Sequence, residues 1–169
     1  MVFAASGFTE EAKDGKECPS PTPLVPSANL QQMKSLAGLW QGTVKHSTGP
    51  DMPLKVEYKV TSGGTAVTEM MSPGTSHEML SVYHDNAGKL AMTHYCMLGN
   101  QPELVLESAE RGKFSFVSSE QTKKSLAGTM YMGSVTLEQP DKDTLVQTWG
   151  GVNPDGSSSD ATVISLKRS

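Results

Sequence analysis

The sequence predicts an all-β protein: a single up-and-down antiparallel β-barrel of about ten strands with a short N-terminal helix. From Leu39 onward, apolar and polar residues alternate with period two, the pattern of half-buried strands. Clusters of Gly, Pro, Asn and Asp interrupt this alternation roughly every 8 to 14 residues, which favours hairpin links over βαβ units. About ten strands joined in this way leave two exposed edges unless the sheet closes. An open β-sandwich is the alternative architecture.

A short helix is predicted just before the first strand. Ser27 or Asn29 can cap its first turn, and Gly38 can end it. The stripe of apolar residues with which this helix would plug one end of the barrel is Leu30, Met33 and Leu36.

Residues 1–26 are predicted to form a flexible tail or a strap, and residues 27–169 the barrel domain. The segment 18–26 contains four prolines, which favour extended backbone over a packed element. The chain has only two cysteines, Cys18 and Cys96, too few for a disulfide framework. A bridge between them is left open.

The strands are placed by the segments that lie between turn residues. Loops such as 85–88 and 153–156 supply Asn, Asp and Gly, which tolerate turn dihedrals. The expected strands are residues 39–46, 53–60, 65–71, 77–84, 89–96, 102–108, 113–118, 129–138, 143–150 and 160–168.

The inward faces follow from the alternation within each strand. In residues 54–60, Leu, Val and Tyr alternate with charged residues, so the even positions, including Tyr58, point inward. The same logic selects Leu80, Val82, Leu90, Met92, Leu104, Leu106, Phe114 and Phe116. The chain contains ten methionines, many in or beside strands, and their flexible thioethers suit an irregular apolar pocket or serve as ordinary core filler.

Two hairpins predict a cluster of polar side chains in the interior. A three-residue loop with Gly88 in the left-handed conformation would pair Leu80 with His94. A four-residue loop at 72–75 would then place Glu69 opposite Glu78. Under this register Glu69, Glu78 and His94 share one interior patch.

Four interpretations of this patch are open. It can be a polar anchor for the head group of an apolar ligand, or a general acid/base site in which one carboxylate titrates high. It can also be a Glu-Glu-His metal site. The structural alternative is an internal ion-pair network that fixes strand register, and a one-residue slip in either loop would dissolve the cluster.

Both ends of the barrel segment resemble the calycin superfamily of lipocalins and fatty-acid-binding proteins. The residues that carry this resemblance are 37–42, with Gly38 and Trp40, and the basic pair Lys167 and Arg168. The resemblance implies that Trp40 closes one barrel end and that Arg168 or Lys167 packs across it.

Three blocks look like an uncharacterised bacterial barrel family. They are residues 61–69, 73–79, and 93–96 followed by 99–102, the last with the pattern THYC then GNQP. This resemblance implies a barrel fold and names no activity. The chain is also similar in outline to haem-binding nitrobindin-like barrels, whose iron ligand is a histidine in the C-terminal part of the chain. No histidine follows His94 here, so we expect no haem in that mode. We also expect no other cofactor and no metal.

The predicted function is binding of a small, mostly apolar molecule in the barrel interior. Glu69, Glu78 and His94 would hold its polar end, and Tyr58, Met92 and Phe116 would line the cavity. The alternative is a barrel enzyme, of isomerase, lyase or hydrolase type, that uses the same carboxylate pair and His94 for acid/base chemistry. The sequence does not decide whether the protein is an enzyme, although binding is the simpler interpretation.

Composition excludes several partners. The net charge is −4 and the lysines are scattered, so no basic stripe is present for nucleic acid. No apolar run approaches the roughly 20 residues of a membrane-spanning helix. A cytoplasmic protein and an exported one whose signal peptide is absent from this chain fit equally well, and the oligomeric state is open.

Overall fold

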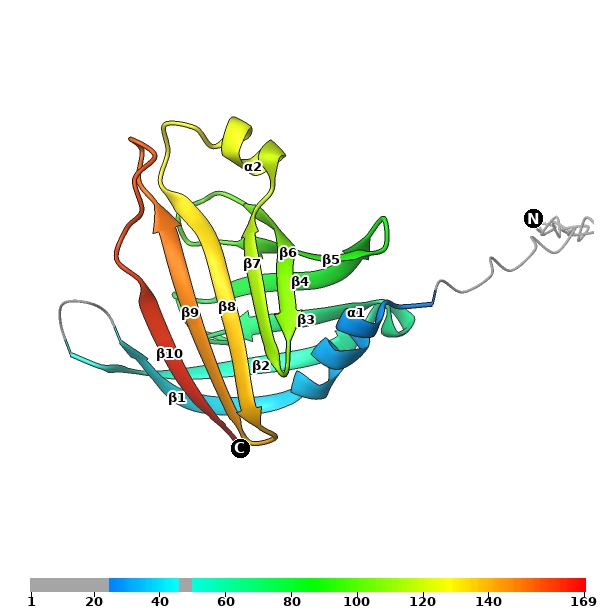
Figure 1. Cartoon of the computed structure of the whole chain (residues 1–169). Helices are drawn as coiled ribbons and strands as arrows, with labels where there is room; N and C mark the ends of the chain where they lie inside the picture. Colours follow the sequence, from blue (N-terminus) through cyan, green and yellow to red (C-terminus); the bar gives the residue numbers. More distant parts are fainter. Residues whose placement is uncertain (1–24, 46–49) are drawn as a thin grey trace, which may run out of the picture.

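The structure, a computed structural model, describes residues 25–45 and 50–169. Its ten strands form a closed antiparallel barrel in which every strand pairs with its sequence neighbours and β1 closes against β10 (Figure 1). The predicted all-β barrel is therefore confirmed, and the open sandwich is wrong. The strands are β1 Gly38–Lys45, β2 Met52–Thr61, β3 Ala66–Met71, β4 Met79–Asn86, β5 Lys89–Tyr95, β6 Glu103–Glu110, β7 Lys113–Ser118, β8 Tyr131–Asp141, β9 Thr144–Val152 and β10 Thr162–Arg168.

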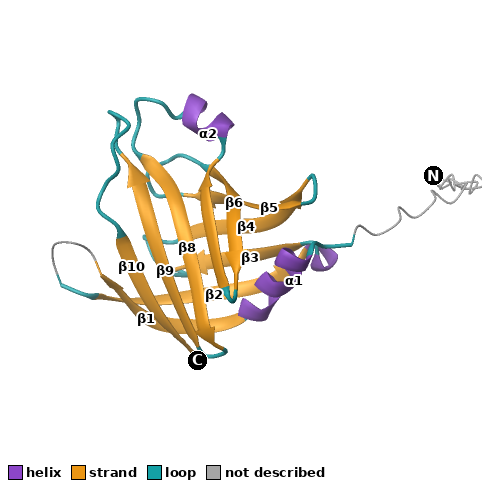
Figure 2. Ribbon diagram, viewed as in Figure 1, coloured by secondary structure: helices purple, strands orange, loops and turns teal. Residues whose placement is uncertain are grey.

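The N-terminal helix packs over one end of the barrel (Figure 2). It consists of α1 (Ala28–Met33) and a 3₁₀ turn, η1 (Lys34–Leu36). Ser27 caps it by accepting a hydrogen bond from the Leu30 amide at 3.1 Å. The same Ser27 donates its backbone N–H and its hydroxyl to the Asp85 carboxylate, at 2.7 and 2.6 Å, which fastens the helix to β4. The predicted stripe of Leu30, Met33 and Leu36 is at most 2% exposed. We call the end of the barrel that α1 and η1 cover the closed end.

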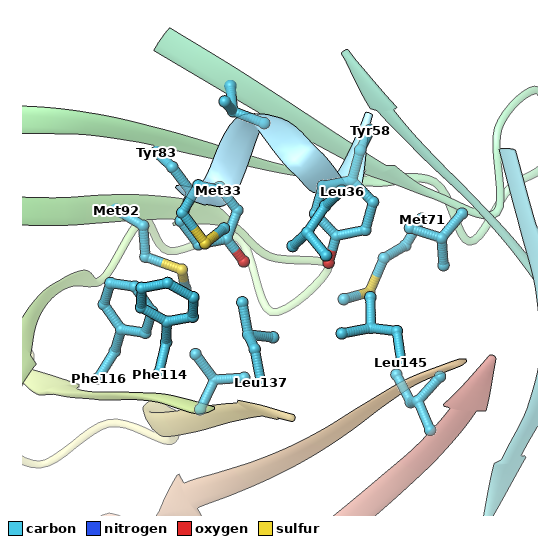
Figure 3. Close-up of a cluster of buried hydrophobic side chains, with 14 of the residues drawn as sticks. Met33, Leu36, Tyr58, Met71, Tyr83, Met92, Phe114, Phe116, Leu137 and Leu145 are labelled. Carbon is cyan, nitrogen blue, oxygen red and sulfur yellow. The ribbon is translucent and has the colours of Figure 1, made fainter. Parts of the chain in front are cut away.

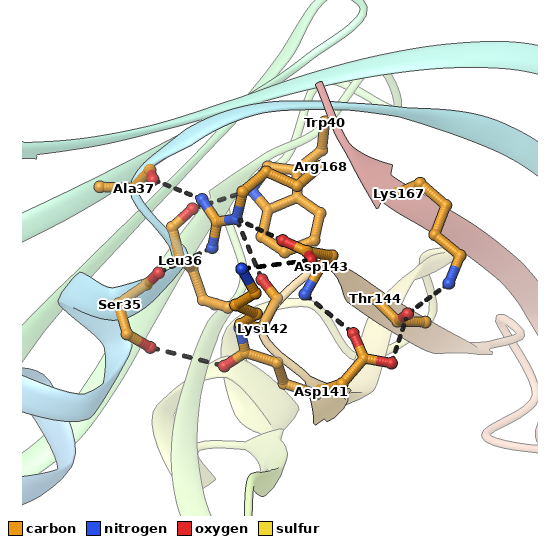
Figure 4. A network of polar contacts seen from close by, with 11 residues as sticks. Ser35, Leu36, Ala37, Trp40, Asp141, Lys142, Asp143, Thr144, Lys167 and Arg168 are labelled. Carbon is orange, nitrogen blue, oxygen red and sulfur yellow. Dashed lines mark hydrogen bonds and ion pairs between the residues drawn. The ribbon is translucent and has the colours of Figure 1, made fainter.

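Trp40 and Arg168 complete the closed end (Figure 4). They are direct partners in the β1–β10 ladder, and the Arg168 guanidinium carbon lies 4.2 Å from the centroid of the Trp40 ring. The guanidinium also donates to the carbonyl oxygens of Ala37 and Ser35, at 2.8 and 2.9 Å. The predicted Trp40/Arg168 contact is thus confirmed, and it ties the last strand to the helix.

A second short helix, α2 (Glu120–Ser125), was not predicted. It lies in the connection between β7 and β8, at the end of the barrel opposite the closed end (Figure 1). Its buried Thr122 hydroxyl accepts from the Glu103 amide at 2.9 Å and donates to the Glu103 carbonyl at 3.0 Å. Unlike the N-terminal helix, α2 contains no apolar residue, so it has no hydrophobic periodicity that a sequence pattern could identify.

The interior face of β4 differs from the prediction. Ser81 and Tyr83 are at most 1% exposed, whereas Leu80 and Val82 are only partly buried on the outer face. The cause is the β4–β5 hairpin, which has a two-residue loop in place of the predicted three-residue loop. Asn86 pairs with Lys89, and both loop residues have positive φ, 50° and 80°. Because side chains alternate along a strand, this one-residue change reverses the face of β4.

The hydrophobic core fills the barrel from the closed end to its middle. Figure 3 shows Met33 and Leu36 of the helical segment above a group of strand side chains that includes Tyr83, Met92 and Phe116. The Tyr83 and Phe116 rings meet edge to face, with centroids 5.7 Å apart. The buried side chains of the helical segment and of the strands thus form one hydrophobic cluster.

Within the described residues, no helix has the length and apolar character that crossing a bilayer requires. The predicted tail, residues 1–26, lies almost entirely outside the described part of the chain. Cys18 lies outside it as well. The bridge between Cys18 and Cys96 therefore stays an open hypothesis.

Candidate functional site

A cavity of about 580 Å³ occupies the end of the barrel opposite α1. Its walls come from the last residues of β1, β3, β5 and β9 and the first residues of β2, β4, β8 and β10. Met52 and Met97, which are 48% and 54% exposed, mark where it reaches the surface. A volume of 300 Å³ or more is typical of small-molecule sites.

The walls of the cavity are mostly apolar and rich in methionine. Five of the ten methionines line it: Met52, Met71, Met79, Met97 and Met132. The remaining apolar walls are Val44, Pro53, Leu54, Trp149 and Ile164, and the polar ones are Ser72, Thr75, His77, His94, Cys96 and Thr162. Flexible thioethers let such walls adapt to an irregular guest.

Beneath the cavity, a buried carboxylate is held by three strands. Glu69 of β3 is 0% exposed. It accepts hydrogen bonds from the hydroxyls of Tyr58 (2.8 Å) and Tyr83 (2.7 Å), and from the side-chain amide of Gln147 (2.5 Å). The Gln147 carbonyl oxygen in turn accepts from the Trp149 indole N–H at 2.9 Å. We call Tyr58, Glu69, Tyr83 and Gln147 the polar layer.

Burial shifts the titration of this layer. The pKa of Glu69 is raised because desolvation disfavours the carboxylate, and the hydrogen bonds from the two tyrosines and Gln147 only partly offset that cost. The pKa values of Tyr58 and Tyr83 are raised well above the usual value, first by burial and then by the Glu69 charge. Both phenols therefore keep their protons and act as donors.

His94 connects the polar layer to the cavity. It is 2% exposed, lines the cavity, and stacks on Trp149 with ring centroids 4.7 Å apart at a tilt of 44°. Its Nδ1 lies 3.0 Å from the Ser81 hydroxyl oxygen. Burial lowers the pKa of His94 from 6.5 to about 4, so the ring is neutral near pH 7.

The structure brings Glu69 and His94 together and separates Glu78 from them. Ser81 pairs with Glu69 on one side and with His94 on the other, so the three share one interior face. Glu78 is exposed in the connection between β3 and β4, where its carboxylate accepts from the Gly74 amide at 2.6 Å. That connection runs for seven residues, because Met71 pairs with Met79. The predicted four-residue loop and the Glu69–Glu78 pair are both wrong.

The other predicted site residues lie in the packed half of the barrel. Tyr58 belongs to the polar layer, whereas Met92 and Phe116 are buried in the core next to it (Figure 3). None of the three is part of the cavity wall. Contact between these residues and a ligand stays a prediction.

Sequence reasoning missed Ser81, Tyr83, Gln147 and Trp149. The signal for Gln147 was present, because it alternates with Leu145 and Trp149 and so lies on the interior face of its strand. No comparable signal marked Ser81, because its strand carries apolar residues on both faces.

In the described part of the chain, no group of three or more His, Cys, Asp or Glu side chains could hold a metal ion. The Glu-Glu-His metal hypothesis and the carboxylate-pair hypothesis both required Glu78 inside the barrel. With Glu78 on the surface, the arrangement that remains is a neutral imidazole above a buried, hydrogen-bonded carboxylate.

Comparison with known proteins identifies the fold and no activity. No protein-family model and no curated protein matches the chain. It is similar to the crystal structure of a DUF3598-family protein of unknown function from Nostoc punctiforme PCC 73102, with a TM-score of 0.58 and 12% identity over 89% of this chain and 53% of that one. It is also similar to Rv2717c from M. tuberculosis, with a TM-score of 0.56 and 13% identity over 86% and 99% of the two chains.

This chain spans about half the length of the DUF3598 protein. At such identities the two likenesses show the barrel fold alone. They fit an uncharacterised barrel family, and the calycin resemblance stays a prediction.

The buried imidazole predicts a loss of stability in mild acid. In the unfolded chain the His94 ring is protonated below about pH 6.5, whereas in the native protein it stays neutral down to about pH 4. The free energy of unfolding should therefore fall as the pH drops from 6.5 to 4, by about 3 kcal/mol if His94 acts alone. Urea unfolding at a series of pH values measures this slope.

Two variants isolate the contribution of His94. His94→Gln should flatten the slope, whereas His77→Gln, at an exposed position, should leave it unchanged. The raised pKa of Glu69 acts in the opposite direction, because the stability it contributes is present below pH 4.5 and is lost as the pH rises through its native pKa. Glu69 is present in all three proteins, so its effect cancels in the comparison. Equal slopes in the wild type and His94→Gln would contradict the prediction.

Proposed function

We propose that this protein binds a small, mostly apolar molecule in the cavity of the barrel, with His94 as the buried polar group that contacts it. The observation that carries this proposal is the combination of volume and wall chemistry: about 580 Å³ lined mainly by apolar side chains. Sites for small molecules have this composition, with a few polar groups that orient the guest.

The division of the barrel into two halves supports the proposal. The half of the barrel next to α1 is packed with core side chains. These side chains stabilise the fold, so the empty space in the other half is not needed for stability. An unfilled apolar space costs free energy through lost contacts, and a bound apolar molecule restores them. The methionine-rich wall is suited to a guest of variable shape.

A fluorescent apolar probe, N-phenylnaphthylamine, tests binding in the cavity. Its emission should rise when it enters the wild-type barrel. Met132→Trp, which puts an indole into the cavity wall, should weaken its binding at least about fivefold, which corresponds to about 1 kcal/mol.

The matched control is Met130→Trp. Met130 lies two residues away, is 43% exposed and is not part of the wall, so this variant should bind like the wild type. Circular dichroism confirms that each variant is folded. Absence of probe binding to the wild type, or equal loss in both variants, would refute the proposal.

Native mass spectrometry identifies the class of the natural ligand. A mass above that of the apo chain, released on denaturation as an apolar compound, is the expected result. An apo mass for protein prepared without detergent or organic solvent, together with no probe binding, would count against a binding role.

A further inference from the structure

Soft donor atoms gather on the wall of the cavity. Its methionine thioethers are joined there by the imidazoles of His77 and His94 and the thiol of Cys96. Among the described residues that line the cavity, none is Lys, Arg, Asp or Glu. Thioether, thiolate and imidazole are ligands for soft metal ions, whereas hard cations such as Ca²⁺ and Mg²⁺ require carboxylate and other oxygen ligands. The wall therefore suits a soft cation and offers little to a hard one.

Three of these donors lie next to one another on the interior face of β4 and β5. Leu80 pairs with Tyr95 in the β4–β5 ladder. The next step of the same register sets Met79 beside Cys96, and both line the cavity. Side chains opposed in this way have Cβ atoms about 5 Å apart. His94 precedes Cys96 by two residues on the same face, about 6.6 Å along the strand. One ion above these positions is within reach of all three side chains.

The His94 ring has one nitrogen engaged and one available. Nδ1 lies 3.0 Å from the Ser81 hydroxyl oxygen, and Nε2 makes no hydrogen bond to any residue that the structure describes. A metal ion bound at Nε2 leaves the ring proton on Nδ1, where the Ser81 oxygen can accept it. Histidines that bind metals almost always donate their other ring N–H to such a partner.

The apolar wall restricts the charge of the ion. Cys96 is the one free cysteine in the described part of the chain. It binds metal as the thiolate, and its proton passes to solvent. A monovalent ion with one thiolate and two neutral donors is a neutral unit. A divalent ion keeps a positive charge that no acidic side chain of the described wall balances, which is costly in apolar surroundings.

We propose that Met79, His94 and Cys96 form a site for a soft monovalent metal ion, Cu(I), on the inner wall of the cavity. Ser81 is a positioning residue that orients the His94 ring. The site goes beyond the proposed binding of an apolar molecule, and it departs from the sequence-based expectation of no metal. The Glu-Glu-His hypothesis required Glu78, whereas this site uses a thioether and a thiolate in place of carboxylates.

Titration with Cu(I) and its redox-inert analogue Ag(I) tests the site. The parent protein is the full chain with Cys18→Ser, which removes the only other thiol. Native mass spectrometry of this parent should show one tightly bound Ag(I). Anaerobic competition with bathocuproine disulfonate gives the Kd for Cu(I), and Zn(II) should bind at least about tenfold more weakly than Cu(I).

Variants in the parent assign the ligands. Cys96→Ser should weaken Cu(I) binding at least about a hundredfold and Met79→Leu at least about tenfold, because each removes a direct ligand. Ser81→Ala should weaken it about tenfold, the effect of losing an outer partner. The matched control is Met130→Leu, the same change at a methionine that is 43% exposed and outside the wall, and it should bind like the parent. Circular dichroism confirms that each variant is folded.

NMR shows directly whether His94 is a ligand. In long-range proton–nitrogen correlations, Ag(I) should shift the Nε2 resonance of His94. The resonances of His84, which is not part of the cavity wall, should stay unchanged. A role of His94 in packing alone would produce no such selective shift.

Three results would overturn the site: equal Cu(I) affinity in the parent and in Cys96→Ser, equal losses in Met79→Leu and Met130→Leu, or an unmoved His94 Nε2. Zn(II) binding as tight as that of Cu(I) would overturn the assignment of the ion. The apolar probe separates this inference from the proposed function, because Cys96→Ser is nearly isosteric. This variant should keep binding N-phenylnaphthylamine while it loses the metal.

Discussion

Glu69→Ala is expected to lower the free energy of unfolding by about 4 kcal/mol, because it leaves the donors of the polar layer without their acceptor. The hydroxyls of Tyr58 and Tyr83 are fully buried, and each unsatisfied buried group costs about 1 to 3 kcal/mol. The space left by the side chain adds a cavity cost. Urea unfolding followed by circular dichroism measures the change.

Glu78→Ala is the matched control, since it removes the other carboxylate that the sequence placed in the same patch. Glu78 is exposed and makes one hydrogen bond, to the Gly74 amide, so its loss should cost less than about 1 kcal/mol. Glu69→Gln should fall between the two, because a tyrosine hydroxyl can rotate to accept from the new amide. Equal losses for the two alanine variants would contradict the observed separation of the carboxylates.

Gly42→Ala is expected to prevent closure of the barrel, with a loss of at least about 3 kcal/mol or an insoluble product. Gly42 pairs with Leu166 across the β1–β10 ladder. A Cβ at position 42 would overlap the backbone carbonyl oxygen of Ser165, which cannot move without opening this ladder. Because β1–β10 is the pairing that closes the sheet, the clash exposes two strand edges.

Gly156→Ala serves as the control for a glycine with strained backbone but no neighbour. Gly156 has a φ of +84° and nothing within 4 Å of an added Cβ, so only the conformational cost of about 1 to 2 kcal/mol applies. Soluble expression and the urea midpoint of the two variants provide the comparison. Comparable stability of both would show that β1 and β10 can separate to accommodate a methyl group.

The fold and the closed end were predictable because local signals specify them. Alternation with period two and regularly spaced turn residues can each be recognised from a few neighbouring positions, and together they predicted the barrel. The cap at Ser27 and the apolar stripe of the helix are likewise local. The Trp40/Arg168 contact was expected from a family resemblance, and the structure contains it.

The interior of the cavity half was only partly predictable. His94 was correctly placed inside because it shares a face with Leu90 and Met92. Glu69 is inside as predicted, although the pairing with Glu78 that led to this prediction is wrong. The strand between them was assigned the wrong face, since Leu80 and Val82 are more apolar than Ser81 and Tyr83 yet lie outside. Apolar character alone could not choose between two faces that both carry apolar residues.

By itself, the sequence determined an all-β barrel with a helix at one end, because periodicity and turn chemistry act over a few residues. Tertiary structure decided the registers of β3, β4 and β5, through a two-residue turn with Ala87 at positive φ and a seven-residue connection before β4. It also decided that half of the interior is packed and half is a cavity. That division depends on how side chains from ten strands pack together, and no single stretch of the sequence contains this information.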